Sequence, residues 1–180
     1  MIQVRLAPEP PSFDREVRQK GLSAIAEMVG RAPSRARPGP RRKRVARRKE
    51  EIPADRFPAY WRAALGSLLE SYERLCAFLA LYLEHATGNP GVDHFIFKSR
   101  RWDQVYEWSN YRLCASTINS RKSDLSGIVD PVECRTGWFA LEWVGFQVIR
   151  GPEAPSHLAP LPFQTPDLRL AWGRVLLFPL

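Results

Sequence analysis

The sequence predicts an α+β fold, with helices in its first half and short strands in its second half. Apolar side chains in residues 60–72 recur three and four positions apart, which is typical of an amphipathic helix. Residues 92–96 read as a short strand after turn residues 88–91, and residues 138–149 alternate like a β-hairpin with Gly145 at its turn. With 180 residues and a hydrophobic fraction of 44%, the chain can bury one core.

The first element expected is a helix that begins near Phe13 and ends at Gly30. Prolines interrupt residues 1–12, so this entry is extended. Ser12 is a candidate N-cap for the helix, and acids follow in its first turn. Gly21 weakens its middle. We interpret residues 1–30 as an extended segment followed by a docking helix.

The positive charge of the chain is concentrated in residues 31–49, which we call the basic arm. The net charge is +8, and ten of the 27 Lys and Arg lie in this arm, which contains no acid. The other 17 bases are outnumbered by 19 Asp and Glu. Residues 31–53 are therefore predicted to be a basic disordered linker with affinity for polyanions. The candidate nucleic-acid contacts within it are Arg41, Arg42, Lys43 and Arg44.

Residues 54–150 are predicted to be the main domain. Its helix starts near Asp55 and runs to Tyr72; residues 76–82 are either a buried strand or a further helical turn. A basic loop at 99–105 and a helix over 110–122 precede the hairpin. Residues 151–180 form a proline-rich, irregular tail. Because this tail ends on hydrophobic residues rather than a polar cap, we expect the chain to be cut short there.

The cysteines and apolar runs indicate a cytoplasmic protein. Cys76, Cys114 and Cys134 form no CxxC pair, which argues against a disulfide framework and favours a reducing compartment. The start of the chain lacks the regions of a signal peptide, and the longest apolar run, 75–83, is too short to span a bilayer. We therefore expect a soluble protein without membrane contact.

Four residues between 93 and 119 match the needs of phosphodiester hydrolysis. That reaction needs an activated water and a Lewis acid on the phosphate. Asp93 and Asn119 offer oxygen ligands of the kind that Mg²⁺ or Mn²⁺ takes, and His94 offers a general base. Neighbours on a strand point to opposite faces, so Asp93 and His94 need a bend or a strand end to share a site. Asn110 is the candidate that orients the imidazole or ties down the loop.

In this order the residues resemble the HNH endonuclease family. The resemblance implies a ββα-metal core, here with added N-terminal helices and a C-terminal β-hairpin. It implies metal ligation by Asp93 and Asn119, a general base in His94, and a loop-holding role for Asn110. The Asn-x-x-Lys spacing at 119–122 also matches the end of the family's helix. From Cys76 to the Gly-Trp-Phe at 137–139, the chain is similar to a bacterial HNH subgroup.

The chain departs from the family pattern at its zinc knuckles. Many members carry two CxxC pairs, and the corresponding positions here are Cys76, Leu79, Ala115 and Ile118. Because three of these four side chains are apolar, we expect no structural zinc, and packing must replace it. Phe97 also stands where the family commonly has a proline.

Charged and aromatic side chains flank these positions. The charged ones are either ordinary solvated groups or phosphate contacts beside the metal: Lys98, Arg100, Arg101, Arg121 and Lys122. The aromatic ones are either a stacking surface for bases or part of the core, and we favour the core: Trp102, Tyr106 and Trp108.

The leading hypothesis is therefore a metal-dependent HNH endonuclease that hydrolyses phosphodiester bonds in DNA, with RNA left open as a substrate. Such an enzyme would serve phage defence or a mobile element. The alternatives are a catalytically inactive HNH-like protein that binds nucleic acid, and a subunit that docks a protein partner such as an operon-encoded ATPase.

Overall fold

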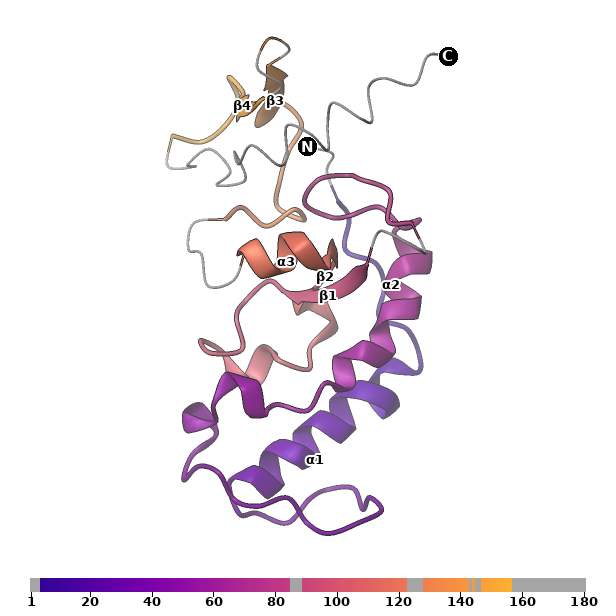
Figure 1. Cartoon of the computed structure of the whole chain (residues 1–180), viewed down its shortest axis with the longest axis vertical. Helices are drawn as coiled ribbons and strands as arrows, with labels where there is room; N and C mark the ends of the chain where they lie inside the picture. The colour runs from indigo at the N-terminus through magenta and orange to yellow at the C-terminus, as the bar shows by residue number, and fades with distance from the viewer. Residues whose placement is uncertain (1–3, 85–88, 123–127, 143, 145–146, 157–180) are drawn as a thin grey trace. The chain divides into compact units, whose positions relative to one another are not determined.

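The computed structural model describes residues 4–84, 89–122, 128–142, 144 and 147–156 (Figure 1). They contain both helices and antiparallel strands, which confirms the α+β class. The chain divides into a larger unit, Leu6–Ala77 with Leu81–Ser123, and a smaller unit, Met1–Arg5, Phe78–Ala80 and Asp124–Leu180. The expected boundaries after residues 30 and 53 do not coincide with a boundary between these units. In the described part, no helix has the length and apolar character needed to cross a membrane.

The N-terminal helix of the larger unit starts and ends close to where it was expected. A π-helical turn, Asp14–Arg18, leads into α1, Gln19–Met28, without a side-chain cap from Ser12. At its end Gly30 has φ +79°, the Gly30 amide donates to the Glu27 carbonyl, and the Arg31 amide donates to the Ala26 carbonyl. These two bonds form a Schellman motif, which requires the left-handed conformation that glycine adopts at little cost.

Gly21 lets α1 contact the ring of Tyr106. A Cβ atom at position 21 would lie 2.2 Å from the Tyr106 ring. Tyr106 is 2% exposed, and its hydroxyl donates to the Pro58 carbonyl at 2.8 Å. The glycine that weakens the helix locally is thus required by tertiary packing.

The second helix is shorter than the sequence predicts. A 3₁₀ helix, Tyr60–Ala64 (η4), precedes α2, Leu65–Ser71, whereas residues near Asp55 form a separate 3₁₀ turn, Ala54–Arg56. Pro58 separates the two pieces, because proline disfavours helical backbone at the residue before it and donates no hydrogen bond. The amphipathic pattern is nevertheless used, since Ala64 and Leu68 are buried.

Residues 76–82 are neither the strand nor the helical turn considered above. Leu75 and Tyr82 form one isolated antiparallel bridge. The amide of Cys76 donates to the carbonyl of Leu81 at 2.8 Å, and the amide of Leu83 donates to Arg74 at 2.8 Å. This segment is therefore a loop whose two ends are hydrogen-bonded to each other.

Two antiparallel strands and a helix follow. The strands β1, Pro90–His94, and β2, Tyr111–Ala115, pair from Pro90↔Ala115 to His94↔Tyr111, and α3, Ser116–Lys122, packs on both. The expected turn at 88–91 is wrong at Pro90 and Gly91, which lie in β1, and the expected strand ends at His94 rather than Ile96.

The predicted helix over 110–122 is wrong in its first half. Four consecutive residues from Tyr111 are buried, and pairing with β1 satisfies their backbone groups. A strand enclosed on both faces accommodates such a run, whereas a surface helix would expose part of it. The 3₁₀ helix Trp108–Asn110 comes just before β2, so Asn110 precedes a strand rather than entering a helix.

The basic arm follows the surface of α1 in the larger unit. Its contacts include the amide of Arg35 with Ser23 Oγ at 2.9 Å, and the amide of Val45 with the Met28 carbonyl at 2.8 Å. The arm has irregular backbone until the short 3₁₀ helix Lys49–Glu51. These hydrogen bonds connect the basic arm to α1, whereas the sequence predicted a disordered linker.

The smaller unit contains the expected hairpin. Its strands β3, Phe139–Glu142, and β4, Gln147–Arg150, pair from Phe139↔Arg150 to Glu142↔Gln147, and the Gly151 amide donates to the Trp138 carbonyl at 2.8 Å. The hairpin expectation is confirmed for these strands, while its turn residue Gly145 lies outside the described residues.

Candidate active site

The carboxylate of Asp93 is buried against the ammonium of Lys122. Nζ of Lys122 lies 3.1 Å from Oδ1 and 3.0 Å from Oδ2 of Asp93, and the two side chains are 1% and 3% exposed. The same ammonium donates to the backbone carbonyls of His94 and Phe95, and the ring of Phe97 covers it at 4.6 Å. Lys122, expected among the phosphate contacts, is thus enclosed and instead joins the end of α3 to the end of β1.

His94 lies on the other face of β1, among aromatic rings. Its ring is 4.8 Å from Trp61 of η4 and 5.2 Å from Tyr111, both edge-on. Nε2 lies 3.0 Å from the Val105 carbonyl. Since a carbonyl only accepts, this bond assigns the proton to Nε2 and leaves Nδ1 as the nitrogen that can accept a proton.

Burial keeps the His94 imidazole neutral. The pKa of His94 is lowered from 6.5 to about 3, first by desolvation and then by the positive charge of Lys98, with a smaller contribution from Lys122. The bond to Val105 acts in the opposite direction. A neutral imidazole is the form a general base requires, although a base works best when its pKa is near the operating pH. A bound phosphate beside Lys98 would offset the lysine charge and raise this pKa.

Asn110 ties together the loop between the two strands. Its Oδ1 accepts from the Ile96 amide at 2.7 Å, and its Nδ2 donates to the carbonyls of Ile96 at 3.0 Å and Gln104 at 2.9 Å. The side chain is 3% exposed. Three hydrogen bonds from one buried amide hold both ends of the loop that follows His94, which is the geometry expected of a loop anchor.

Asn119 lies on α3 three residues before Lys122. Residues with this spacing share one face of a helix, so Asn119 and Lys122 lie on the same side of α3. Asn119 is half-buried. A carboxylate and an amide oxygen are suitable ligands for Mg²⁺ or Mn²⁺. The chemistry of this donor pair therefore fits a hard divalent cation.

The ammonium of Lys122 competes with a metal at Asp93. Mg²⁺ binds carboxylate oxygen at about 2.1 Å, and both Asp93 oxygens already have a positive charge within 3.1 Å. The two cations would repel each other, so a metal ligated by Asp93 requires Lys122 to move. In the described part of the chain, no group of three or more His, Cys, Asp or Glu could hold a metal ion; Asp93 with Asn119 supplies only one ligand of these types.

The other expected phosphate contacts differ in their availability. Lys98 is half-buried, its Nζ lies 4.5 Å from the Trp61 ring, and burial lowers its pKa. Arg100 is exposed, whereas Arg101 is ion-paired with Asp103 at 2.6 Å. The side chain of Arg121 lies outside the described residues. Lys98 is therefore the cation that shares an aromatic neighbour, Trp61, with His94.

Four residues of the basic arm were expected to contact nucleic acid, and one of them has a hydrogen-bonded side chain while three are exposed. Arg42 donates to the Tyr60 hydroxyl at 3.1 Å and lies 3.8 Å from the buried carboxylate of Glu27. The other three are exposed: Arg41, Lys43 and Arg44. Exposed cations on an irregular segment can contact phosphates without losing an internal ion pair.

The expected aromatic core is confirmed for Tyr106 and Trp108. Both are buried, and the Trp108 indole donates to the Ala7 carbonyl at 2.7 Å. Trp102 is half-exposed, with the Lys49 ammonium 4.7 Å from its ring.

Sequence reasoning missed the residues that surround His94 and the partner of Asp93. Trp61, Val105 and Tyr111 surround the ring, and nothing in their local pattern indicates this role. The Asn-x-x-Lys spacing puts Lys122 on the same side of α3 as Asn119, but it did not reveal the ion pair with Asp93.

Of the four positions that correspond to the zinc knuckles, only Cys76 is a thiol; a second buried thiol, Cys114, lies one residue before Ala115. Cys76 and Cys114 are free and buried, and a hydrogen bond between their sulfur atoms, together with burial, raises the pKa of Cys114. The Cys114 thiol therefore remains protonated at neutral pH, and the two buried side chains contribute packing and a hydrogen bond to each other.

Compared with protein-family models, with curated proteins and with solved structures, the chain matches none. The evidence for function is therefore its own residues and their geometry.

Proposed function

We propose that this chain is a metal-dependent endonuclease of the HNH type, with a ββα-metal core made by β1, β2 and α3, acting on DNA. One observation chiefly supports the proposal. Asp93 and His94 end β1, and α3 reaches that strand end through Lys122, one helical turn beyond Asn119. The four residues singled out by their chemistry thus belong to one strand–loop–strand–helix unit.

Each residue has a separate role in the proposed reaction. Asp93 and Asn119 would hold Mg²⁺ or Mn²⁺, which when bound polarises the phosphate and stabilises the leaving oxygen. His94 accepts the proton of the attacking water at Nδ1, while its Nε2 remains bonded to Val105. Lys98 binds the phosphate, and Asn110 keeps the intervening loop in position.

Plasmid nicking with Mg²⁺ or Mn²⁺ tests the proposal. Wild type is compared with His94→Ala, with His94→Gln as a less disruptive variant, and circular dichroism checks that each protein is folded. Loss of a general base lowers rates by roughly 10²–10⁴-fold. Equal cleavage by wild type and both folded variants would contradict the assignment.

The ion pair of Asp93 with Lys122 favours a second candidate, a catalytically inactive HNH-like protein that binds nucleic acid. The charge of Asp93, the candidate metal ligand, is already neutralised by Lys122, and the lowered pKa of His94 makes its imidazole a weak base. This candidate predicts salt-sensitive DNA binding without cleavage under any divalent metal. Arg41→Gln, Lys43→Gln and Arg44→Gln together should lower DNA affinity, whereas unchanged affinity would argue against binding through the basic arm.

A further inference from the structure

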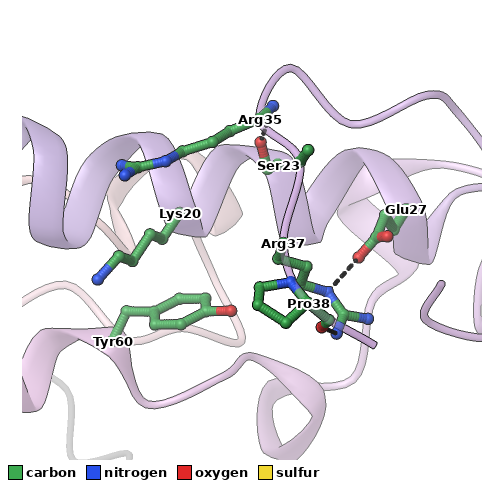
Figure 2. A pocket seen from close by; sticks show the side chains of 8 residues that line it. Lys20, Ser23, Glu27, Arg35, Arg37, Pro38 and Tyr60 are labelled. Carbon is green, nitrogen blue, oxygen red and sulfur yellow. Dashed lines mark hydrogen bonds and ion pairs between the residues drawn. The ribbon is translucent and has the colours of Figure 1, made fainter. Parts of the chain in front are cut away.

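A cavity of about 260 Å³ lies between α1, the basic arm and Tyr60. Figure 2 shows Tyr60 opposite α1, with Lys20 pointing toward its ring and Arg37 and Pro38 near its hydroxyl end. The remaining lining residues are Ser23, Glu27, Arg35 and Ala36. The volume is somewhat below the roughly 300 Å³ at which sites for drug-sized ligands begin, so the cavity suits a small group.

The wall formed by the basic arm is fastened to α1 by hydrogen bonds and an ion pair. Ser23 Oγ accepts from the Arg35 amide at 2.9 Å and lies 2.9 Å from Ser34 Oγ. Further along, Arg37 Nε lies 3.2 Å from Glu27 Oε2. These contacts give the cavity its shape without a ligand, which reduces the ordering cost of binding one.

The lining carries more positive than negative charge. Glu27 is its single acid, and its buried carboxylate is already compensated by Arg37 and by Arg42 at 3.8 Å. Lys20 pairs with Glu16 at 2.6 Å. Arg35 donates to the backbone carbonyl of Arg15 and forms no ion pair with an acid in the described part of the chain. Its guanidinium therefore provides charge for an anion.

The 3₁₀ helix η4 connects this cavity to the candidate active site. Tyr60 lines the cavity, whereas the next residue, Trp61, packs against His94 with ring centroids 4.8 Å apart. A chain of ligand units bound beside His94 could thus extend toward the cavity along η4. The cavity offers the ring of Tyr60, the guanidinium of Arg35 and the buried hydroxyl of Ser23. An aromatic ring can stack on a nucleobase, and a guanidinium can bind its phosphate.

We propose that this cavity is a subsite for one nucleotide of a bound strand, next to the phosphate that is cleaved. The base packs on Tyr60, and the phosphate is bound by Arg35 with Lys20. The identification of the ligand as part of a substrate strand rests on the proposed nuclease function. The shared chemistry, a phosphate on a nucleoside, also occurs in free nucleotides, so the experiment must separate these two sources.

The test measures binding of thymidine 5′-monophosphate to the full chain by calorimetry, with thymidine and inorganic phosphate as partial probes. Arg35→Gln should weaken binding on the order of tenfold, and Tyr60→Leu by a similar factor. Arg56→Gln is the matched control, because it removes the same charge from an exposed residue that lies outside the basic arm and does not line the cavity. Equal weakening by Arg35→Gln and Arg56→Gln would overturn the subsite.

A competition experiment distinguishes the strand from the free nucleotide. A single-stranded thymidine oligonucleotide should be displaced by the monophosphate in wild type, and Arg35→Gln should weaken its binding. Binding of the monophosphate without competition would overturn the strand subsite. Failure of plasmid cleavage with both binding results intact would contradict the nuclease alone, whereas cleavage without monophosphate binding would contradict the subsite alone.

Discussion

Replacing Lys122 by methionine removes the buried counter-charge of Asp93 and should strongly destabilise the larger unit. Methionine keeps the apolar length of the side chain, so the change mainly deletes the ammonium. That ammonium has two carboxylate oxygens and two backbone carbonyls within 3.3 Å. Breaking a buried pair by removing one partner costs about 3–5 kcal/mol. Urea unfolding at pH 7, followed by tryptophan fluorescence, measures the loss.

A double-variant cycle separates the ion pair from general disruption. Asp93→Asn alone should also be destabilised, while Asp93→Asn combined with Lys122→Met should lose less than the two single losses added together. The reason is that the double variant leaves no unpaired charge in the core. Additive losses, or a loss below about 1 kcal/mol for Lys122→Met, would refute the assignment of this contact as a buried ion pair.

The same variant also tests whether Asp93 can hold a metal. Without the ammonium, Mg²⁺ bound by Asp93 and Asn119 should restore stability by about 2.7 kcal/mol at a concentration one hundred times the Kd. Wild type should gain less, because Lys122 competes for the same oxygens. Asn119→Ala in the Lys122→Met background should reduce the gain, and NaCl at matched ionic strength controls for screening. An equal Mg²⁺ effect in wild type and Lys122→Met would contradict a metal position at Asp93.

Three further predictions concern groups around the same unit. The pKa of His94 is about 3 in the folded protein, below its ordinary value of 6.5. On acidification, His94 therefore becomes protonated in the unfolded chain before it does in the folded protein. The free energy of unfolding should consequently fall by about 2 kcal/mol between pH 6.5 and pH 5. Urea unfolding across that interval should show a weaker pH dependence for His94→Gln than for wild type; equal slopes would count against the buried neutral ring. Gly21→Ala should destabilise the protein by about 1–3 kcal/mol, because the added methyl group overlaps the ring of Tyr106. Gly66→Ala in α2 should instead stabilise it by up to about 1 kcal/mol, because nothing lies within 4 Å of the added methyl group. Thermal unfolding compares the two variants, and a stabilised Gly21→Ala would show that the Tyr106 ring can move aside. Asn110→Ala should cost about 2–4 kcal/mol, since buried loop groups lose their hydrogen bonds, and faster amide hydrogen exchange at residues 95–104 should accompany it; unchanged exchange would argue against the anchor.

Local interactions explain which features were predictable. The Schellman end at Gly30 and the alternation in 138–149 depend on residues a few positions apart, and both occur near their expected positions. The chemistry-bearing residues could also be chosen from their types and order. Two of them, Asp93 and His94, lie at the end of β1, although their side chains are on opposite faces of the strand.

The sequence by itself determined that the chain has an α+β composition, an N-terminal helix ended by glycine, and four candidate nuclease residues in one order. Only the tertiary structure decided that residues 111–115 form a strand, that Gly21 makes room for Tyr106, and that Lys122 neutralises Asp93. The physical reason is the separation along the chain between each residue and the partner that determines its structure. Strand pairing, ring packing and a buried counter-charge depend on partners 17 to 85 residues away, whose positions local propensity and periodicity do not contain.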